Sequence, residues 1–457
     1  MSKKVKQARV MNMTQGPILK QILMFAVPLF AGILLQQTYN LADAAIVGRY
    51  LGSDALAAVG CSTSIQSLAS NFCVGTGTGL TILIGQQYGA GKLLEMRKYL
   101  FHGNILAAAF AGGLTALFVL LAGVILRWLQ TPNAIYTDAR CYLLIFFLGI
   151  PFCMAYNYLA GLMRAVGDSL TPFRILALTT ILNIAMDLLF VMVLHLGCPG
   201  AAAATTLSQA ISAVLCFAIL QKRFELFRLL PEDRTWDAGA ARRQLIVGVP
   251  MGLQYSITAI GGMILQTANN GLGSVYISAY TAGGKILNFT ICPFDALSSA
   301  VASFAAQNCG AGKTRRIRQG ILTGYGTGLV FCLIVGGLLV LRGSEMSMLM
   351  LSPDAVPELD AAGRFLACNG SAFFLLAFLN ISRQAVQGMG FAGRAMICGV
   401  IETICRILIS MLLVPRIGFE AICITNGICW LCAALYIVPV CLNCCSRIPQ
   451  AKEEERA

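Results

Sequence analysis

Two aspartates within apolar stretches are the residues of this chain best suited to chemistry. Asp43 lies near the end of the first stretch, and Asp187 lies in the fifth, one helical turn after Asn183. A charged side chain at the bilayer centre costs about 2.5–3.5 kcal/mol on insertion scales, so such residues usually serve a function. If they converge with the hydroxyl of Thr205 in a low-dielectric pocket, these groups would form either a proton relay or a small Na⁺ site. The alternative for Asp43 is a position at the water interface, where it would cap a loop.

Charged residues also occur in apolar stretches of the second half. Lys285 and Asp295 roughly share one face of a helix, and either could line a substrate cavity. Glu402 and Arg406 are spaced i,i+4, which suits a salt bridge, and the plainer interpretation is a self-neutralising structural pair. Three polar residues one or two turns before Asp43 could line a cavity as well: Gln36, Tyr39 and Asn40.

Prolines and glycines recur at positions where helices would bend or pack closely. Pro28 and Pro250 occupy matching places in the first and seventh stretches. Proline removes a backbone hydrogen bond and kinks a helix. A kink near Asp43 could couple its protonation to helix bending, or both prolines could be fixed bends. The Gly75-Thr-Gly77-Thr-Gly79 run predicts close helix approach rather than phosphate binding, because it lies in mid-stretch.

The stretches that hold these residues are long enough to cross a membrane. The chain has 457 residues, of which 57% are hydrophobic and 12% charged, and its mean hydropathy is +0.75. Soluble domains carry about 25% charged residues. We therefore predict an all-α polytopic membrane protein, since only helices satisfy the backbone of such spans in lipid. Twelve spans are expected: 18–47, 53–84, 98–126, 138–160, 172–194, 201–220, 244–269, 274–305, 319–341, 361–386, 395–414 and 419–443.

An internal repeat divides these spans into two groups of six. Gln86-Gln-Tyr-Gly-Ala-Gly-Lys92 with Arg97 recurs as Gln307-Asn-Cys-Gly-Ala-Gly-Lys313 with Arg318. Repeats of a hydrophobic unit are typical of transporters whose substrate site lies between the halves. The predicted organisation is an N-lobe at 1–221, a cytoplasmic linker at 222–243, a C-lobe at 244–446 and a cytoplasmic tail at 447–457.

The formal net charge of +13 is distributed unevenly along the chain. With the N-terminus inside, most basic residues fall in cytoplasmic segments. The outer segments hold only a few arginines: Arg49, Arg127, Arg140, Arg342, Arg364 and Arg416. This bias predicts a multi-pass protein of the cytoplasmic (inner) membrane with both termini in the cytoplasm, rather than a nucleic-acid partner. No cleavable signal peptide is expected ahead of the first span.

Motifs for other chemistries do not occur in the sequence. Gly312-Lys313-Thr314 resembles the end of a Walker A loop, but residue 307, where that motif requires glycine, is Gln. The chain has only two histidines and no Gly-x-Ser-x-Gly element. Its eighteen cysteines are expected to pack helices rather than to bind metal. We expect a protein that is not an enzyme, has no cofactor, and draws energy from an H⁺ or Na⁺ gradient.

Several motifs together resemble one family. The segment from Asp43 to Gly60 closely resembles the opening motif of the MATE (multidrug and toxin extrusion) transporters. The Gly-Ala-Gly-Lys turn that ends at Lys92 is similar to the family's turn after the second helix. The Asn183-x-x-x-Asp187 pattern and the later Gly200-Ala-Ala-Ala-Ala-Thr205 segment resemble its fifth and sixth helices. The similarity covers essentially the whole chain and is strongest to the bacterial branch with an aspartate in the first helix.

The resemblance implies a fold, an activity and a site. It implies two pseudo-symmetric six-helix bundles around a central cavity, and export of cationic or amphipathic drugs or metabolites by alternating access. It also implies an H⁺ or Na⁺ site on Asp43, Asn183, Asp187 and Thr205. A monomer is expected, because one chain contains both lobes.

Another transport class remains as an alternative. A lipid-linked oligosaccharide flippase of the same superfamily would need a cationic cavity to hold a pyrophosphate. Only Lys285 and Arg406 are expected within spans, and Glu402 would neutralise the latter.

Overall fold

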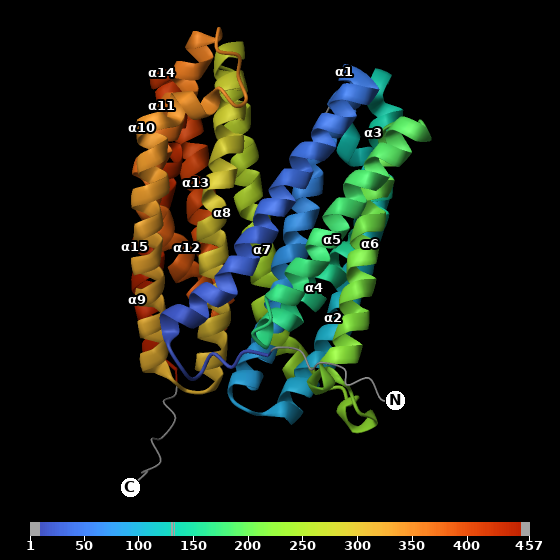
Figure 1. The fold of residues 1–457 in the computed structure, drawn as a ribbon, viewed down its shortest axis with the longest axis vertical. Helices are drawn as coiled ribbons and strands as arrows, with labels where there is room; N and C mark the ends of the chain where they lie inside the picture. The colour runs from blue at the N-terminus through green and yellow to red at the C-terminus, as the bar shows by residue number, and fades with distance from the viewer. Residues whose placement is uncertain (1–9, 129–130, 132, 449–457) are drawn as a thin grey trace. The chain divides into compact units, whose positions relative to one another are not determined.

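The protein is an assembly of helices in every part that the structure describes (Figure 1). The computed structural model describes residues 10–128, 131 and 133–448, and it gives only the backbone at 44, 45, 47–49, 51–59, 61, 128, 133 and 134. Nearly all of the predicted tail at 447–457, and the side chains of most of the motif from Asp43 to Gly60, lie outside this description. No strand occurs within the described ranges, which confirms the predicted all-α class.

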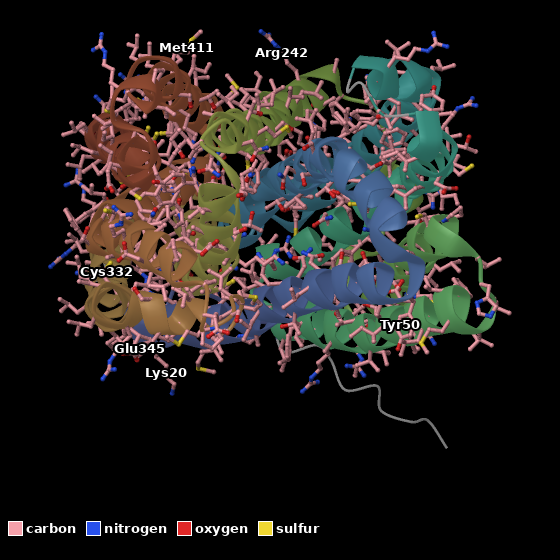
Figure 2. The ribbon with its side chains drawn as sticks, turned by 90° about the horizontal axis from the view of Figure 1, so that it is seen from above. Lys20, Tyr50, Arg242, Cys332, Glu345 and Met411 are labelled. Atoms are coloured by element: carbon pink, nitrogen blue, oxygen red, sulfur yellow. The ribbon has the colours of Figure 1, made fainter. Side chains whose placement is uncertain are left out.

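Membrane-length helices follow one another along the whole chain. Eleven helices or helix runs in the described part are long and apolar enough to span a bilayer, and counting one bent pair as a span gives the predicted twelve. Large apolar side chains such as Leu120, Leu333 and Leu341 are 80% exposed. Met411 also points away from its helix in Figure 2 and is 70% exposed. Such apolar exposure suits contact with hydrocarbon rather than with water.

The helices group into two compact units. Among the described residues, the first unit contains 10–12 and Ala31–Ser256, and the second contains Met13–Phe30 and 257–448. The first thirteen residues of α1, 18–30, therefore belong to the second unit, and the start of α7, up to Ser256, belongs to the first. The predicted lobes assign each of these helices to one side, because helix counting cannot detect a change of neighbours within a helix. Both changes occur close to Pro28 and Pro250.

The first unit is built from α1 to α6 and the start of α7. Its helices are α1 (Ile18–Gly89), α2 (Leu93–Trp128), α3 (Asn133–Leu148), α4 (Ile150–Ala165), α5 (Leu170–Asp187) with the π-helical η1 (Leu188–Val193), and α6 (Gly197–Arg223). Helix α1 carries two spans, Ile18–Asp43 and Ser62–Gly89. The backbone is helical through the break expected at 48–52, although Gly48 and Gly52 have low helix propensity. Two 3₁₀ turns, η2 (Glu225–Phe227) and η3 (Pro231–Asp233), lead to α7 (Ala238–Asn270).

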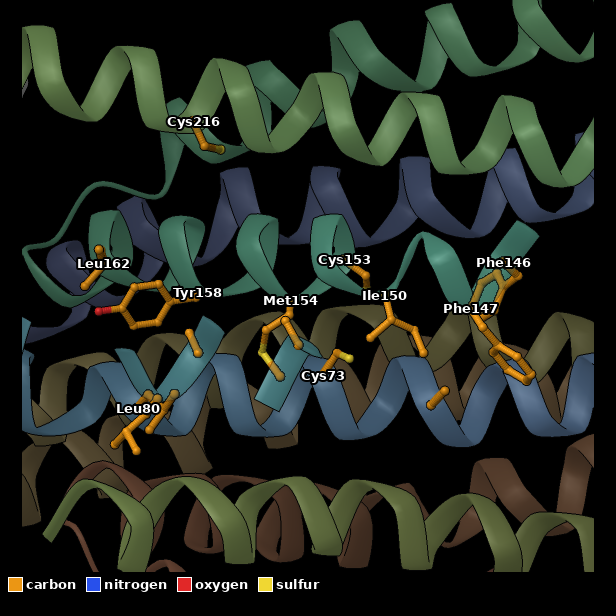
Figure 3. Close-up of a cluster of buried hydrophobic side chains, with 14 of the residues drawn as sticks. Cys73, Leu80, Phe146, Phe147, Ile150, Cys153, Met154, Tyr158, Leu162 and Cys216 are labelled. Carbon is orange, nitrogen blue, oxygen red and sulfur yellow. The ribbon is translucent and has the colours of Figure 1, made fainter. Parts of the chain in front are cut away.

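An apolar core holds the first unit together. Figure 3 shows Ile150 and Met154 of α4 beside Cys73 of α1, and all three are buried. Gly75 lies against α7, where an added Cβ would come within 2.6 Å of the Met251 carbonyl oxygen. The glycine run thus lets two helix backbones meet, as the sequence predicts.

The second unit contains the remaining helices. They are α8 (Ser274–Gly310), α9 (Thr314–Phe331) continued by η4 (Cys332–Gly336) and α10 (Gly337–Ser347), α11 (Val356–Ser371), α12 (Phe373–Gly388), α13 (Ala392–Leu412), α14 (Val414–Ile417) and α15 (Phe419–Ser446). Helices α11 and α12 form one span with a 52° bend. The bend follows Asn369-Gly370-Ser371, three residues of low helix propensity.

The second copy of the repeated motif holds the start of α1. The backbone N–H of Met13 donates to Oε1 of Gln307 at 2.8 Å, and Nδ2 of Asn308 donates to the Met13 carbonyl at 3.1 Å. The motif lysine, Lys313, donates from Nζ to the Thr14 carbonyl at 3.0 Å. This copy of the motif therefore has a structural use: it fixes the chain that enters the first helix.

Candidate ion and substrate sites

Three of the four predicted ion-site residues lie in the first unit as buried groups without partners. Asp187 is fully buried at the end of α5, and Asn183, one turn earlier, is 3% exposed. Neither carboxylate oxygen of Asp187 and neither amide atom of Asn183 has a hydrogen-bond partner among the described residues, nor does Oδ1 of Asp43 on α1. A buried polar group without a partner costs about 1–3 kcal/mol, and more when it is charged. Such an oxygen-rich set can bind a proton or a small cation.

The aspartates are close enough for their charges to interact. Asp43 acts electrostatically on Asp187 and on Tyr39, which lies one turn before it on α1. The same charge reaches Tyr142 of α3, whose hydroxyl accepts a hydrogen bond from Nε2 of Gln66 at 3.0 Å. The hydrogen bond between Gln66 and Tyr142 joins α1 to α3. When both aspartates are ionised they repel each other, so a bound proton or cation would relieve the repulsion.

The other residues predicted for this region lie around the cluster. Thr205 is half-buried on α6, the helix that packs on α5. Gln36 and Asn40 are exposed on α1, and Tyr39 is half-buried. Pro28 and Pro250 both lie inside continuous helices and are half-buried. The roles assigned to these residues remain predictions.

A cavity of about 480 Å³ lies within the second unit. Lys285 and Asp295 of α8 both line it, as do residues of α7, α12, α13 and α15. Its aromatic and apolar lining includes Tyr280, Phe365 and Trp430. This volume falls within the range of about 300–1,000 Å³ that is typical of small-molecule sites.

A hydrogen-bonded charge network forms one wall of this cavity. Nδ2 of Asn380 donates to Oδ1 of Asp295 at 3.2 Å, and Nη2 of Arg383 donates to Oδ1 of Asn380 at 2.6 Å. Nη1 of Arg383 donates to Oε1 of Glu402 at 3.2 Å. Glu402 also pairs with Arg406, with 3.7 Å between Oε2 and Nη2, as the i,i+4 spacing predicts. Helices α8, α12 and α13 are therefore joined through their charges.

Arg383 is a charged cavity residue that the sequence analysis does not identify, although it lies inside the predicted stretch 361–386. Its side chain is only 14% exposed and is held by Asn380 and Glu402. The signal that could have identified it is the i,i+3 spacing from Asn380, which places both on one helix face.

One ion pair lies at the start of α7, outside the cavity. Asp237 accepts from Lys98 Nζ on Oδ2 at 2.6 Å and from the Gly239 N–H on Oδ1 at 2.7 Å. These contacts, first the Lys98 ammonium and then the backbone N–H groups of Gly239 and Ala240, lower the pKa of Asp237 to about 2. The pair anchors the first turn of α7 to α2.

The family of the chain follows from its match to a family model. The model of the MatE family matches residues 28–189 and again residues 250–412. The chain belongs to the MatE family. The two matches begin at Pro28 and Pro250, the prolines that the internal repeat aligns, so the repeat and the family model define the same duplicated unit.

Relatives and solved structures agree with this membership. A probable multidrug resistance protein of Bacillus subtilis, YpnP, is 32% identical over 67% of this chain and 68% of its own length. A solved outward-facing conformation of a multidrug resistance MATE family transporter has a TM-score of 0.90 at 20% identity, covering 98% of this chain and 100% of the other. A MOP superfamily transporter from Pyrococcus furiosus, described by the reversed polarity of its binding pocket, has a TM-score of 0.90 at 21% identity, with the same coverage.

Membership settles the broad class of the protein. This MatE chain is a membrane transporter of the multidrug efflux family, not an enzyme. The solved structures confirm the predicted fold class. No group of three or more His, Cys, Asp or Glu residues that could hold a metal ion occurs in the described part of the chain.

Proposed function

We propose that this MatE chain is a secondary active antiporter of the cytoplasmic membrane. It exports cationic or amphipathic drugs or metabolites in exchange for H⁺ or Na⁺, as a monomer with both termini in the cytoplasm. The observation that carries the proposal is the cluster of Asp43, Asn183 and Asp187, whose buried polar atoms lack hydrogen-bond partners in the part of the chain that the structure describes. Carboxylates placed in this way are expensive to retain unless they bind and release an ion during the transport cycle.

Charge relief at the cluster would drive the conformational step. In the ion-free state Asp43 and Asp187 repel each other, and a bound proton or Na⁺ removes that repulsion. The ion therefore favours whichever arrangement brings the carboxylates closest. Pro28 lies in the same helix as Asp43, and its missing hydrogen bond lowers the cost of bending α1. Ion binding and the opening of the transporter would be coupled through α1.

Ethidium efflux from whole cells or everted vesicles tests this function. The gradient applied is ΔpH or ΔNa⁺, one at a time, so that the effective gradient identifies the coupling ion. Asp43→Asn and Asp187→Asn should each lower gradient-driven efflux about 5–150-fold, the range of typical coupling energies. Asp354→Asn, a change at an exposed carboxylate before α11, is the matched control and should leave efflux unchanged. Normal efflux in both cluster variants at equal membrane levels would refute coupling at this site.

A flippase for lipid-linked oligosaccharides is the second candidate. The observation in its favour is Arg383, which adds a third cation to the cavity that contains Lys285 and Arg406. Asp295 and Glu402 in the same cavity offset two of these charges. One excess positive charge suits a singly charged group better than a pyrophosphate. Failure of the wild type to move any cation under either gradient would favour the flippase.

A further inference from the structure

We propose that the cavity of the second unit binds the anionic group of an aromatic organic molecule, with Lys285 as the residue that pairs with it. The group is a carboxylate or another singly charged anion, so the substrates include zwitterionic and anionic amphipaths. This inference rests on the proposed function, because it assumes that the chain moves small organic molecules.

The balance of charges inside the cavity supports an anionic group. Its charged lining consists of Lys285, Arg383 and Arg406 against Asp295 and Glu402. A solvated cavity lining with one excess positive charge attracts an anionic ligand and repels a cationic one. The excess charge is that of Lys285, because the other four charged residues are linked to one another, Asp295 through Asn380.

The two arginines are committed to the wall of the cavity. Both guanidinium groups contact the single carboxylate of Glu402. Nη1 of Arg406 also donates to the Thr258 carbonyl of α7 at 3.2 Å, and Arg383 also bonds Asn380. These contacts fix the orientation of the guanidinium groups. Together with Glu402 and Asp295 they form a fixed, overall neutral wall rather than a mobile ligand-binding arm.

Lys285 is free to bind a ligand. Its side chain is exposed to the cavity, and it has no ion-pair partner among the described residues. Asp295 lies on the same helix ten residues later, about 15 Å along the axis at 1.5 Å per residue, too far for direct pairing. A flexible ammonium that has no ion-pair partner among the described residues, beside an overall neutral network, is well placed to hold an anionic group.

The apolar lining of the cavity determines the rest of the ligand. Tyr280 and Phe365 form an edge-to-face pair with 5.3 Å between ring centroids, and Leu376, Leu379 and Trp430 complete the surface. Such a surface suits a flat aromatic body. A cavity of about 480 Å³ can hold a three-ring dye.

Two dyes that differ only at a carboxylate test the proposal. Rhodamine 110 has a free carboxylate, and rhodamine 123 is its methyl ester. Binding of each dye to the purified full chain in lipid nanodiscs is measured by fluorescence anisotropy. The ratio of the two affinities should fall at least ~5-fold in Lys285→Met, since even a solvated ion pair at 4 Å contributes about 1 kcal/mol. Lys285→Arg should keep the ratio.

A matched lysine controls for the loss of charge. Lys222 is exposed near the end of α6 in the first unit, and Lys222→Met should leave the ratio unchanged. Folding of Lys285→Met is checked by its affinity for the ester, which should be no weaker than that of the wild type, because the variant lacks a charge that repels the cationic ester. An unchanged acid-to-ester ratio in Lys285→Met with normal ester binding overturns the proposal.

Failure of this inference can be told apart from failure of the proposed function. If wild-type vesicles exchange neither dye under either gradient, while the binding ratio depends on Lys285, antiport is wrong and the anion site stands. If vesicles exchange the ester under a gradient and the acid-to-ester affinity ratio is the same in Lys285→Met as in the wild type, the antiport proposal stands and the anion site is wrong.

Discussion

The two units differ in whether their buried carboxylates are hydrogen-bonded. In the first unit, Asp187 and Asn183 are buried and have no hydrogen-bond partner in the described part of the chain. In the second, Asp295 and Glu402 are each held by side chains of neighbouring helices. Since one family model matches both halves, a common fold carries two electrostatic designs. The unpaired carboxylates of the first unit lower stability and are suited to binding and releasing an ion. The paired carboxylates of the second unit join helices and form a fixed wall of the cavity.

The largest expected effect comes from breaking the charge network around Glu402 in the second unit. Glu402→Ala leaves two buried guanidinium groups without their shared carboxylate, so the free energy of unfolding should fall by about 3–5 kcal/mol. SDS-induced unfolding of the purified protein in micelles measures the change. The control is Glu420→Ala, which removes an exposed carboxylate paired with Arg364 and should cost about 0–1 kcal/mol. Equal losses in the two variants would contradict the contrast between buried and exposed pairs.

A smaller loss of stability is expected when a side chain added on α7 presses against Arg406 of the same network. At Gly261 an added Cβ would lie 3.0 Å from Nη1 of Arg406 and 3.0 Å from Oγ1 of Thr403. Gly261→Ala should therefore lower the free energy of unfolding by about 1–3 kcal/mol. The next residue is a matched control, because a Cβ at Gly262 meets nothing within 4 Å. Gly262→Ala should raise stability by about 0.5–1 kcal/mol, and a loss equal to that of Gly261→Ala would show that the effect at Gly261 does not come from its contacts with Arg406 and Thr403.

In the first unit the expected change has the opposite sign. Asp187→Asn removes a charge that has no partner and that repels Asp43, so stability should rise by about 1 kcal/mol while coupled efflux is lost. Unfolding in micelles and ethidium efflux are measured on the same preparation. The control, Asp138→Asn on the exposed face of α3, should change neither. A destabilised Asp187→Asn would mean that the ionised carboxylate is well solvated.

The smallest effect concerns the half-buried ion pair of Lys98 and Asp237 at the start of α7. The pKa of Asp237 is about 2 in the folded protein, below the value of about 3.9 for an unfolded chain. Because the folded pKa is depressed, the pair stabilises the protein above pH 4, and this contribution is lost as the pH falls through about 2. The difference between wild type and Asp237→Asn in denaturation midpoint should be constant from pH 5 to 8 and shrink between pH 4 and 2. A difference that grows on acidification would contradict the sign.

Sequence patterns predict much of this fold because the length and apolar composition of a single segment decide whether it forms a membrane span. The stretch 172–194 is found as α5 and η1, with Asn183 and Asp187 on one buried face, since apolar length and helical spacing decide both. Arg383 was missed because the burial of a residue near the end of a span depends on partners from α8 and α13. The change of unit within α1 and α7 was missed for a similar reason. Which helices a segment packs against is a property of the tertiary fold, not of periodicity.

The way α1 and α7 change unit bears on any attempt to divide the protein. A cut in the connection between α6 and α7 gives a first piece that keeps residues 13–30, which belong to the second unit, and lacks 238–256. The second piece has the reverse defect. Neither piece alone contains all the segments of one compact unit, so each would expose packing surfaces that the other normally covers. Two co-expressed pieces would fold only if each supplied the segment of α1 or α7 that completes the other's unit. The duplicated halves therefore depend on each other for folding and are not two independent domains.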